Sequence, residues 1–143
     1  MPIIGDYPDQ CLRGIKSKTL IPEEGLVNNE LFYFDEKNSN GFFELSINWN
    51  DPEKAIPFTL AQKKDDGVEI KYKGGIAVID RSELDKINKL QLLNGMLSYE
   101  RAKLPENLYH GNLLLNGDVS KLKRKYIAVT LAIHVSEIIP QME

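Results

Sequence analysis

The longest apolar run of the chain lies near its C-terminal end and constrains the fold more than any other feature. It extends from Tyr126 to Val135 and follows directly on a cluster of four cations. Such a run is buried in most folded proteins, so it marks the position of the core. Asp118 or Ser120 can cap a helix that contains the run, and Pro140 can end it. About twenty residues without a turn signal are too long for a typical strand, so the length favours a helix.

The predicted helix is apolar around most of its circumference. One stripe at helical spacing consists of Val119, Leu122, Tyr126, Val129 and Ile133. A helix of this kind is expected in the middle of the domain, packed on the sheet and on a second helix. The branched residues of 126–135 also suit a central strand, which remains the alternative at this point.

A second helix is predicted to begin at Ser82. Two carboxylates lie in its first turn, where the helix dipole favours negative charge. Its apolar residues recur at a spacing of three, at Leu84, Ile87, Leu90 and Leu93. The pair Asn94-Gly95 should weaken or end this helix, and residues 96–103 are expected to resume it.

Strand patterns dominate residues 1–80. Segments 31–34 and 42–49 are rich in aromatic and branched residues, and the turn-like composition between them predicts an antiparallel hairpin. Alternation along the second segment places four large apolar residues on the face expected to meet the core, namely Phe43, Leu45, Ile47 and Trp49. Further strands are predicted at 11–15, 68–72 and 76–79, the last two separated by a bend.

The segment after the hairpin begins like a helix. A polar cap at Asn50 and a proline in the first turn are typical of a helix start, whereas Pro57 makes the continuation ambiguous. Residues 57–63 fit a helix or a strand, and we favour a helix that starts again at Pro57.

Together these patterns predict a single α+β domain over residues 1–143. We expect an antiparallel or mixed sheet of about four to five strands from the N-terminal half, packed against two C-terminal helices. Residues 1–30 contain scattered prolines and glycines and are expected to form an irregular segment packed on the domain. The predicted core consists of Leu45, Ile47, Trp49, Ile76, Val78, Ile79, Leu84, Ile87, Leu90, Val129, Leu131 and Ile133.

Composition argues against several classes of protein. With 18 basic and 21 acidic side chains the formal charge is -3, which argues against binding to nucleic acid or membranes through a strongly cationic surface. Cys11 is the sole cysteine, so no intrachain disulfide can form, and we expect a small buried thiol in a reducing compartment. No segment has the pattern of a signal peptide or a membrane span. We therefore expect a cytoplasmic protein without a membrane partner.

Four cations begin the C-terminal helix, and they are Lys121, Lys123, Arg124 and Lys125. They can contact phosphates or dock an acidic partner, and the alternative is a solvated face that keeps an apolar helix soluble. The solvated face is the commoner role of a short charge run. Nucleic-acid binding would need Tyr126 to face outward beside these cations.

The segment Tyr109-His110-Gly111-Asn112 is where a histidine is expected in a loop beside other polar groups. His110 can move protons near neutral pH, and Gly111 can let the backbone approach a ligand. The alternative is a loop histidine whose ring bonds a backbone carbonyl. His134 lies in the apolar run and is expected to be a neutral core side chain. Two histidines so far apart predict no metal site.

Three scattered features resemble the order of parts in ADP-ribosyltransferase-type folds. The pair Arg13-Gly14 lies on an early expected strand, Ser46 lies on a later strand before a helix start, and an apolar strand follows at 76–79. The resemblance implies that the arginine and the serine contact a dinucleotide. Enzymes of this type typically also present a catalytic glutamate, but Glu100 and Glu137 both fall in expected helices.

On sequence alone we favour a non-enzymatic binding or accessory protein. This interpretation includes no cofactor and no metal, and its partners are proteins, among them a second copy of the same chain. The aromatic residues Phe32, Phe34 and Phe42 would be the first candidate interface if they are not part of the core.

Two alternative functions follow from the motifs above. A nucleotide-utilising enzyme with an ADP-ribosyltransferase-like arrangement predicts a concave pocket where Arg13 and Ser46 converge with Tyr109 or His110. A nucleic-acid-binding protein predicts instead a basic stripe over 121–125.

Overall fold

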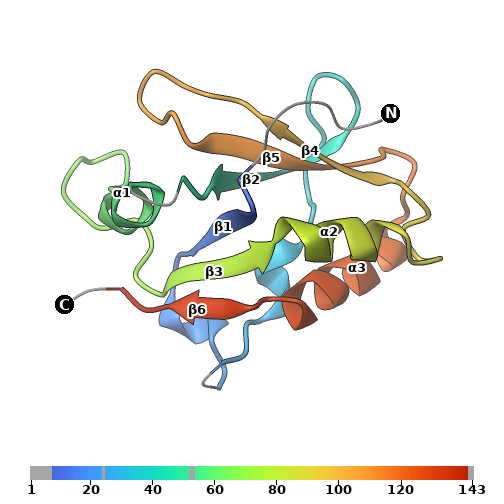
Figure 1. Ribbon diagram of the computed structural model, residues 1–143, viewed down its shortest axis with the longest axis horizontal. Helices are drawn as coiled ribbons and strands as arrows, with labels where there is room; N and C mark the ends of the chain where they lie inside the picture. Colours follow the sequence, from blue (N-terminus) through green and yellow to red (C-terminus); the bar gives the residue numbers. More distant parts are fainter. Residues whose placement is uncertain (1–7, 24, 52–53, 142–143) are drawn as a thin grey trace.

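In residues 8–23, 25–51 and 54–141, which the computed structural model describes, six strands form one open antiparallel sheet (Figure 1). They are β1 (Gln10–Ile15), β2 (Phe43–Trp49), β3 (Gly75–Asp80), β4 (Leu97–Arg101), β5 (His110–Leu115) and β6 (Glu137–Ile139), in the order β4-β5-β2-β1-β3-β6. The helices are α1 (Ala55–Ala61), α2 (Arg81–Asn88) and α3 (Lys121–Ile133), with short 3-10 helices η1 (Lys18–Leu20) and η2 (Asn29–Phe32). The predicted α+β class is confirmed. The sheet is larger than expected because β4, β5 and β6 come from the second half of the chain.

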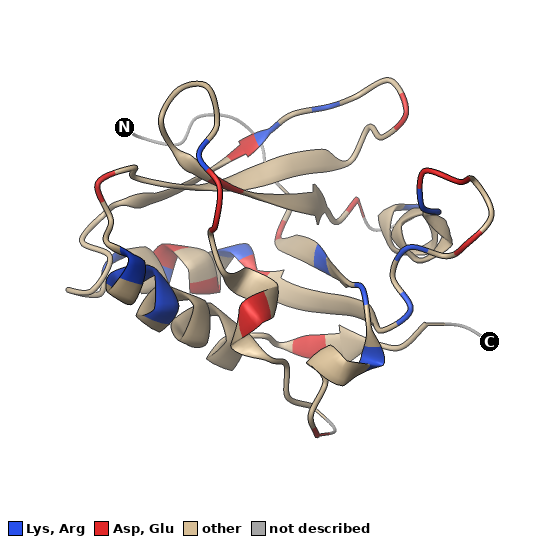
Figure 2. Cartoon of the chain, turned by 180° about the vertical axis from the view of Figure 1, so that it is seen from behind, with Lys and Arg blue, Asp and Glu red and all other residues tan. Residues whose placement is uncertain are grey.

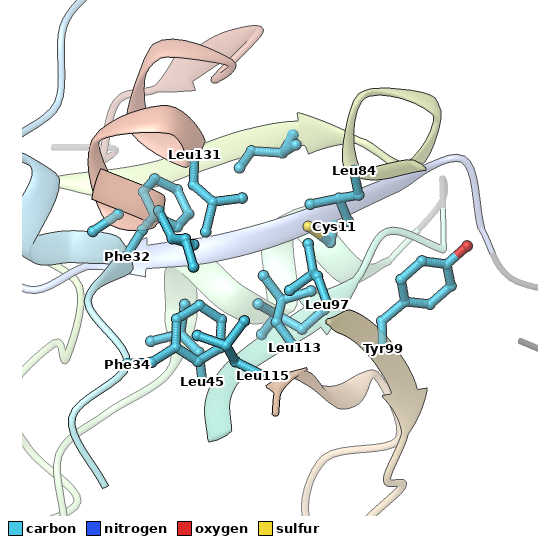
Figure 3. Packing of buried hydrophobic residues seen from close by; sticks show 14 of the residues in the cluster. Cys11, Phe32, Phe34, Leu45, Leu84, Leu97, Tyr99, Leu113, Leu115 and Leu131 are labelled. Atoms are coloured by element: carbon cyan, nitrogen blue, oxygen red, sulfur yellow. The ribbon is translucent and has the colours of Figure 1, made fainter. Parts of the chain in front are cut away.

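The main core lies on one face of the sheet. Alternation along β2 turns Phe43, Leu45, Ile47 and Trp49 to this face, as predicted, and all four are buried. Helices α2 and α3 and the 3-10 helix η2 contribute side chains to the same cluster. Figure 3 shows residues of the sheet, of α2 and of α3 around one common interior.

The opposite face of the sheet is divided into two halves. Over β1 and β3 it is apolar, and Leu12, Ile76 and Val78 form a smaller cluster with Ala55 and Leu60 of α1. Over β2, β5 and β4 the register and the alternation bring polar residues together on this face, namely Glu44, Ser46, Asn48, Glu100, His110 and Asn112. A mainly polar half-sheet thus adjoins an apolar half-sheet on one side of the molecule.

Nine of the twelve predicted core residues are buried. The exceptions are Leu90, Val129 and Ile133, which are 44%, 40% and 73% exposed. Leu90 lies beyond the end of α2, where helical spacing no longer applies. Helix α3 instead meets the core through Ile127 and Leu131, together with a small alanine between them. Of the stripe expected to face inward, Val119 before the helix is buried, and the four residues within α3 face outward.

Helix α3 begins where the sequence predicts but ends earlier. The hydroxyl of Ser120 accepts a hydrogen bond from the Lys123 N–H at 3.2 Å, which caps the helix. The helix ends at Ile133, and residues 137–139 pair with β3 as β6 instead of continuing the helix to Pro140. This pairing gives the outer edge of β3 the hydrogen-bond partners that buried backbone requires.

His134 is not the core side chain that the apolar run suggests. It is the partly buried C-cap of α3, and its Nδ1 atom lies 2.7 Å from the Thr130 carbonyl oxygen. Its Nε2 atom lies 3.9 Å from the Glu83 carboxylate at the start of α2.

The segment predicted to resume the second helix forms β4 instead. Asn94 and Gly95 both have positive φ, so the chain turns there. After the turn, Leu97 and Tyr99 alternate into the core, and the whole of β4 pairs with β5. Pairing with β5 outweighs the helix preference of this short segment.

The aromatic segment at 31–34 is not a strand of a hairpin. Part of it is η2, and the connection to β2 consists of an isolated bridge between Lys37 and Phe43. Phe32 and Phe34 are fully buried, so they are not an exposed interface, and only Phe42 of that trio is exposed.

The ambiguous segment after β2 is helical. Helix α1 includes Pro57 in its first turn, where a missing backbone N–H costs nothing. Residues 68–72, all of which the structure describes, form no strand and contain one isolated bridge from Ile70 to Lys63.

Two alanine substitutions two residues apart test which stripe of α3 is buried. Leu131→Ala should lower the free energy of unfolding by about 2 to 4 kcal/mol, since it leaves a cavity in the core. Ile133→Ala should change it by less than about 0.5 kcal/mol, because that side chain is exposed. Urea unfolding of both variants measures the difference. Equal losses would contradict the placement of α3.

Candidate functional site

The sheet opens between its two central strands. β1 pairs with β3 over six residues, but its ladder with β2 contains only Cys11↔Trp49 and Leu12↔Asn48. Beyond these pairs the side chain of Arg13 occupies the gap. Its Nη1 donates to the Ser46 carbonyl at 2.8 Å, and its Nε donates to the Leu31 carbonyl at 3.0 Å. A guanidinium thus replaces the backbone ladder at this point.

The charge of Arg13 sits in a poorly solvated position. Burial lowers the pKa of its guanidinium, and the phenol of Tyr72 acts in the opposite direction. Two carbonyl oxygens, those of Ser46 and Leu31, bond the cation directly. Arg13 and Ser46, which lie far apart in the sequence, meet here through the backbone of Ser46, whose side chain remains exposed.

Gly14 presents its backbone to the same gap. The Asn50 N–H donates to the Gln10 carbonyl on the β2 side, so the alternate residues of β1 point their backbone groups toward β2. The N–H and C=O of Gly14 accordingly point to the side where the ladder has stopped. The ring of Tyr72 lies against its Cα, in the space that a Cβ would need. Only glycine allows this ring to approach the strand so closely.

A cavity of about 290 Å³ opens beside this gap. Its polar lining comes from three strands, helix α1 and two loops, and includes Gly14, Ser46, Asn48, Tyr72, Glu106 and His110. We call it the Gly14 cavity. Strands β1, β2 and β5 form its base, and loop residues such as Tyr72 and Glu106 complete its polar lining.

Buried amides hold one wall of the Gly14 cavity in place. The Asn48 Nδ2 donates to Thr59 at 2.8 Å and to Gln62 at 3.1 Å, and its Oδ1 accepts from Asn107 at 2.9 Å. The Asn107 Oδ1 in turn accepts from the Tyr109 N–H. The network ties β2, α1 and the loop before β5 together. Such fully bonded networks restrict side chains to one arrangement.

His110 stands among carboxylates at the rim of the cavity. Partial burial lowers the pKa of its imidazole, although Glu44, Glu100 and Glu106 all act to raise it. The lowered pKa keeps the ring neutral at pH 7, and a neutral imidazole can accept a proton.

A line of polar residues crosses the open half-sheet next to the cavity. Ser46 of β2 is paired with Asn112 of β5, and Asn112 is paired with Glu100 of β4. The Asn112 Nδ2 donates to the Glu100 carboxylate at 3.2 Å, and its buried Oδ1 has no hydrogen-bond partner in the structure. Glu100 thus lies on a strand, not in a helix, and it faces the candidate site.

A second, larger cavity of about 1110 Å³ shares His110 with the first. Cationic side chains lining it include Lys54, Arg81, Arg101 and Lys103. Acidic side chains are interspersed, and Arg81 lies 3.7 Å from the Asp9 carboxylate. Tyr109 belongs to this second cavity, where its ring packs 5.2 Å from that of Phe58.

Gly111 has a role different from the one its sequence context suggests. A Cβ at this position would collide with the indole of Trp49, whose Nε1 donates to the Glu100 carbonyl at 3.0 Å. The glycine therefore lets a tryptophan cross β5 to reach β4. It does not serve the approach of a ligand.

Basic residues lie together in the first turns of α3 (Figure 2). Their roles differ. Arg124 stacks 4.1 Å over the Phe43 ring and donates to the Phe34 carbonyl at 2.9 Å, so it belongs to the fold. Lys121 and Lys125 are exposed, and Tyr126 beside them is exposed as well. Tyr126 therefore has the orientation that nucleic-acid binding requires, although Arg124 is already engaged.

The remaining candidates from the sequence form neither a reactive thiol nor a metal site in the described residues. Cys11 is buried, as expected, and burial raises the pKa of its thiol to about 12, so it stays protonated and unreactive at neutral pH. In the described parts of the chain, no group of three or more His, Cys, Asp and Glu side chains could hold a metal ion. None of the helices described there has the length and apolar character needed to span a membrane.

Comparison with known proteins gives no match. No family model matches the chain, and no match was found among curated proteins or solved structures. Function must therefore be argued from the site itself.

Several lining residues of the Gly14 cavity belong to no motif in the sequence. Tyr72 lies in a loop without a motif, and Asn48 and Asn107 look like ordinary polar residues. One signal was available, since a glycine directly after a strand arginine indicates a close approach of other groups to the backbone.

Replacing Arg13 tests its role between the strands. Arg13→Met removes both donors and leaves the carbonyls of Ser46 and Leu31 without this partner, so the free energy of unfolding should fall by about 2 to 4 kcal/mol. Lys16→Met, on an exposed residue just after β1, is the matched control and should be nearly neutral. Urea denaturation measures both. Equal stability of the two variants would show that the guanidinium does not hold the strands.

The lowered pKa of His110 predicts a pH dependence with a definite sign. The unfolded chain binds the imidazole proton more tightly, with the usual pKa near 6.5, so this term should destabilise the protein as pH falls through that value. NMR titration should give a His110 midpoint below 6.5. The loss of stability from pH 7.5 to pH 5 should be smaller in His110→Gln. A midpoint above 6.5 would mean that the three glutamates outweigh burial.

Proposed function

We propose that this protein is a nucleotide-utilising enzyme of the ADP-ribosyltransferase type, with its nicotinamide site in the Gly14 cavity. The proposal rests first on Ser46, which lines the Gly14 cavity, and on Arg13, which is not among the lining residues but bonds the Ser46 carbonyl at the opening between β1 and β2. These are the two residues that the sequence resemblance assigns to dinucleotide contact.

The shape of the cavity suits a planar carboxamide. Gly14 directs one backbone donor and one backbone acceptor toward the opening, and a carboxamide offers the matching acceptor and donor. The ring of Tyr72 beside Gly14 supplies an aromatic face for stacking. A volume of about 290 Å³ accommodates one ring system and not a whole dinucleotide.

The rest of a dinucleotide has room in the second cavity. Both cavities are lined by His110, so a ligand seated in the first can extend past this residue. Lys54, Arg101 and Lys103 line the second cavity and suit the diphosphate, since cationic side chains bind phosphate oxygens well.

The proposed reaction breaks the bond between ribose C1′ and the nicotinamide nitrogen. The electron pair leaves with nicotinamide, an acceptor nucleophile forms the new bond to C1′, and the proton of the acceptor passes to a base. Positive charge grows on the ribosyl group in the transition state, so a nearby carboxylate lowers the barrier. Glu106 lines the Gly14 cavity and is our first candidate for this role, and Glu100 is the second. Neutral His110 is suited to accept the proton.

Binding is tested before catalysis. Isothermal titration should detect nicotinamide and NAD binding to the wild-type chain, and Tyr72→Ala should weaken both at least tenfold because the stacking face is lost. Phe42→Ala removes an exposed aromatic ring outside the cavity and serves as the control. Failure of the wild type, shown to be folded by circular dichroism, to bind either ligand at millimolar concentration would overturn the proposal.

Catalysis is then followed as release of nicotinamide from NAD by chromatography. Glu106→Gln should reduce the rate at least a hundredfold without weakening NAD binding in the same proportion. Glu36→Gln, in an exposed position outside the cavity, is the control. If the rate falls in Glu100→Gln but not in Glu106→Gln, Glu100 is the carboxylate that stabilises the transition state.

A second candidate function is protein binding, which the sequence favours. One observation supports it, namely a row of exposed apolar side chains along α3. Both functions suit a cytoplasmic protein, a setting that the single cysteine of the sequence favours.

A further inference from the structure

One face of α3 is apolar and uncovered. Leu122, Tyr126, Val129 and Ile133 are 62%, 57%, 40% and 73% exposed, and their spacings of four, three and four residues place them in one row. This spacing is the one by which two helices interlock along a common seam. A row of four large side chains on one helix goes beyond the isolated apolar residues that any surface carries.

The charges around this row are unequally distributed along the helix. Its first turns carry exposed Lys121 and Lys125, and α3 contains no acidic residue (Figure 2). Near its other end lie Glu83, which is 3.9 Å from His134 and 3.4 Å from Lys86, and the exposed Glu137, which is the acidic group available to a partner. The row is thus cationic at one end and has acidic neighbours at the other.

We propose that this row is the interface of a symmetric homodimer in which the α3 helices of two copies pack antiparallel. A two-fold contact requires a surface that complements itself, and an apolar row with opposite charges at its two ends does so only in the antiparallel arrangement. Leu122 of one copy then lies against Ile133 of the other, and the cationic end meets the acidic end. The two helix dipoles also point in opposite directions, which is the favourable arrangement for neighbouring helices.

A parallel arrangement is disfavoured on the same grounds. It would set Lys121 against Lys121 and Lys125 against Lys125, and it would align the two dipoles. A foreign acidic helix would satisfy the cations but would set like charge against the exposed Glu137 at the other end.

The expected dimer is weak. A helix of 13 residues is about 20 Å long, so a contact along it lies at the low end of interface sizes, where association is transient. We expect the mass measured by light scattering to rise from 16.3 kDa toward twice that value between about 1 and 200 μM protein.

A surface substitution tests the interface without disturbing the fold. Ile133→Asp places a charge in the row and should keep the protein monomeric over the whole concentration range. Val68→Asp places the same charge on a loop residue that is 76% exposed and lies outside α3, and it should leave dimer formation unchanged. A monomeric wild type at 200 μM, or a dimer that survives Ile133→Asp, would overturn the proposal. So would a mass increase that requires an added oligonucleotide.

Disulfide trapping tests the antiparallel direction. An oxidised mixture of Leu122→Cys and Ile133→Cys chains should form a crosslink between the two kinds of chain. Each variant oxidised by itself should form few crosslinks. Residues 122 and 133 lie about 16 Å apart along the helix, which is beyond the reach of a disulfide. In an antiparallel dimer the two copies of the same cysteine are therefore too far apart to join. In a parallel dimer they lie opposite each other, so self-crosslinking of one variant reports a parallel dimer. The native Cys11 is buried and does not interfere. Efficient self-crosslinking of Leu122→Cys would contradict the antiparallel arrangement.

Discussion

The guanidinium of Arg13 joins the two halves of the sheet where their backbone ladder has opened. It binds the carbonyl of Ser46 on β2 and the carbonyl of Leu31 in η2, so it links both halves to the segment that underlies α3. Because the side chain satisfies these carbonyls, the strands can separate without leaving them unbonded. The separation directs the backbone of Gly14 into a cavity. A structural side chain therefore creates the opening on which the proposed nicotinamide site depends.

In the polar half-sheet beside this opening, one face of a strand contributes to the core and the other face contributes to the proposed site. One face of β2 supplies four core residues, whereas its other face carries Ser46 and Asn48 toward the site. The buried amide network around Asn48 fixes one wall, and the carboxylates around His110 stay close to solvent. A rigid base with titratable groups at its rim is an arrangement suited to binding a ligand and moving a proton.

Particular elements show how far prediction from the sequence reached. Alternation in β2 was predicted correctly, and Ser120 was one of the two caps predicted for α3, because both signals depend on neighbouring residues alone. The strand at 97–101 was taken for helix because its strand character comes from pairing with β5, which the local sequence does not reveal. Arg13, Ser46 and His110 were recognised as candidates. Tyr72 and Asn48 were not, since a loop tyrosine and a strand asparagine have no distinguishing pattern until the fold brings them to one cavity.

The sequence by itself determined the α+β class, the core face of β2 and the existence of a strongly apolar C-terminal helix, because these follow from periodicity and capping within short segments. Only the tertiary structure decided which side of that helix is buried. Two apolar stripes run along α3, and the one with Ala128 packs inward, where a small side chain lets the helix approach the core closely. The tertiary structure alone also brought residues from β1, β2, α1 and β5 to one cavity. The physical reason is the same in both cases: burial and convergence depend on the shapes of partners that are distant in sequence.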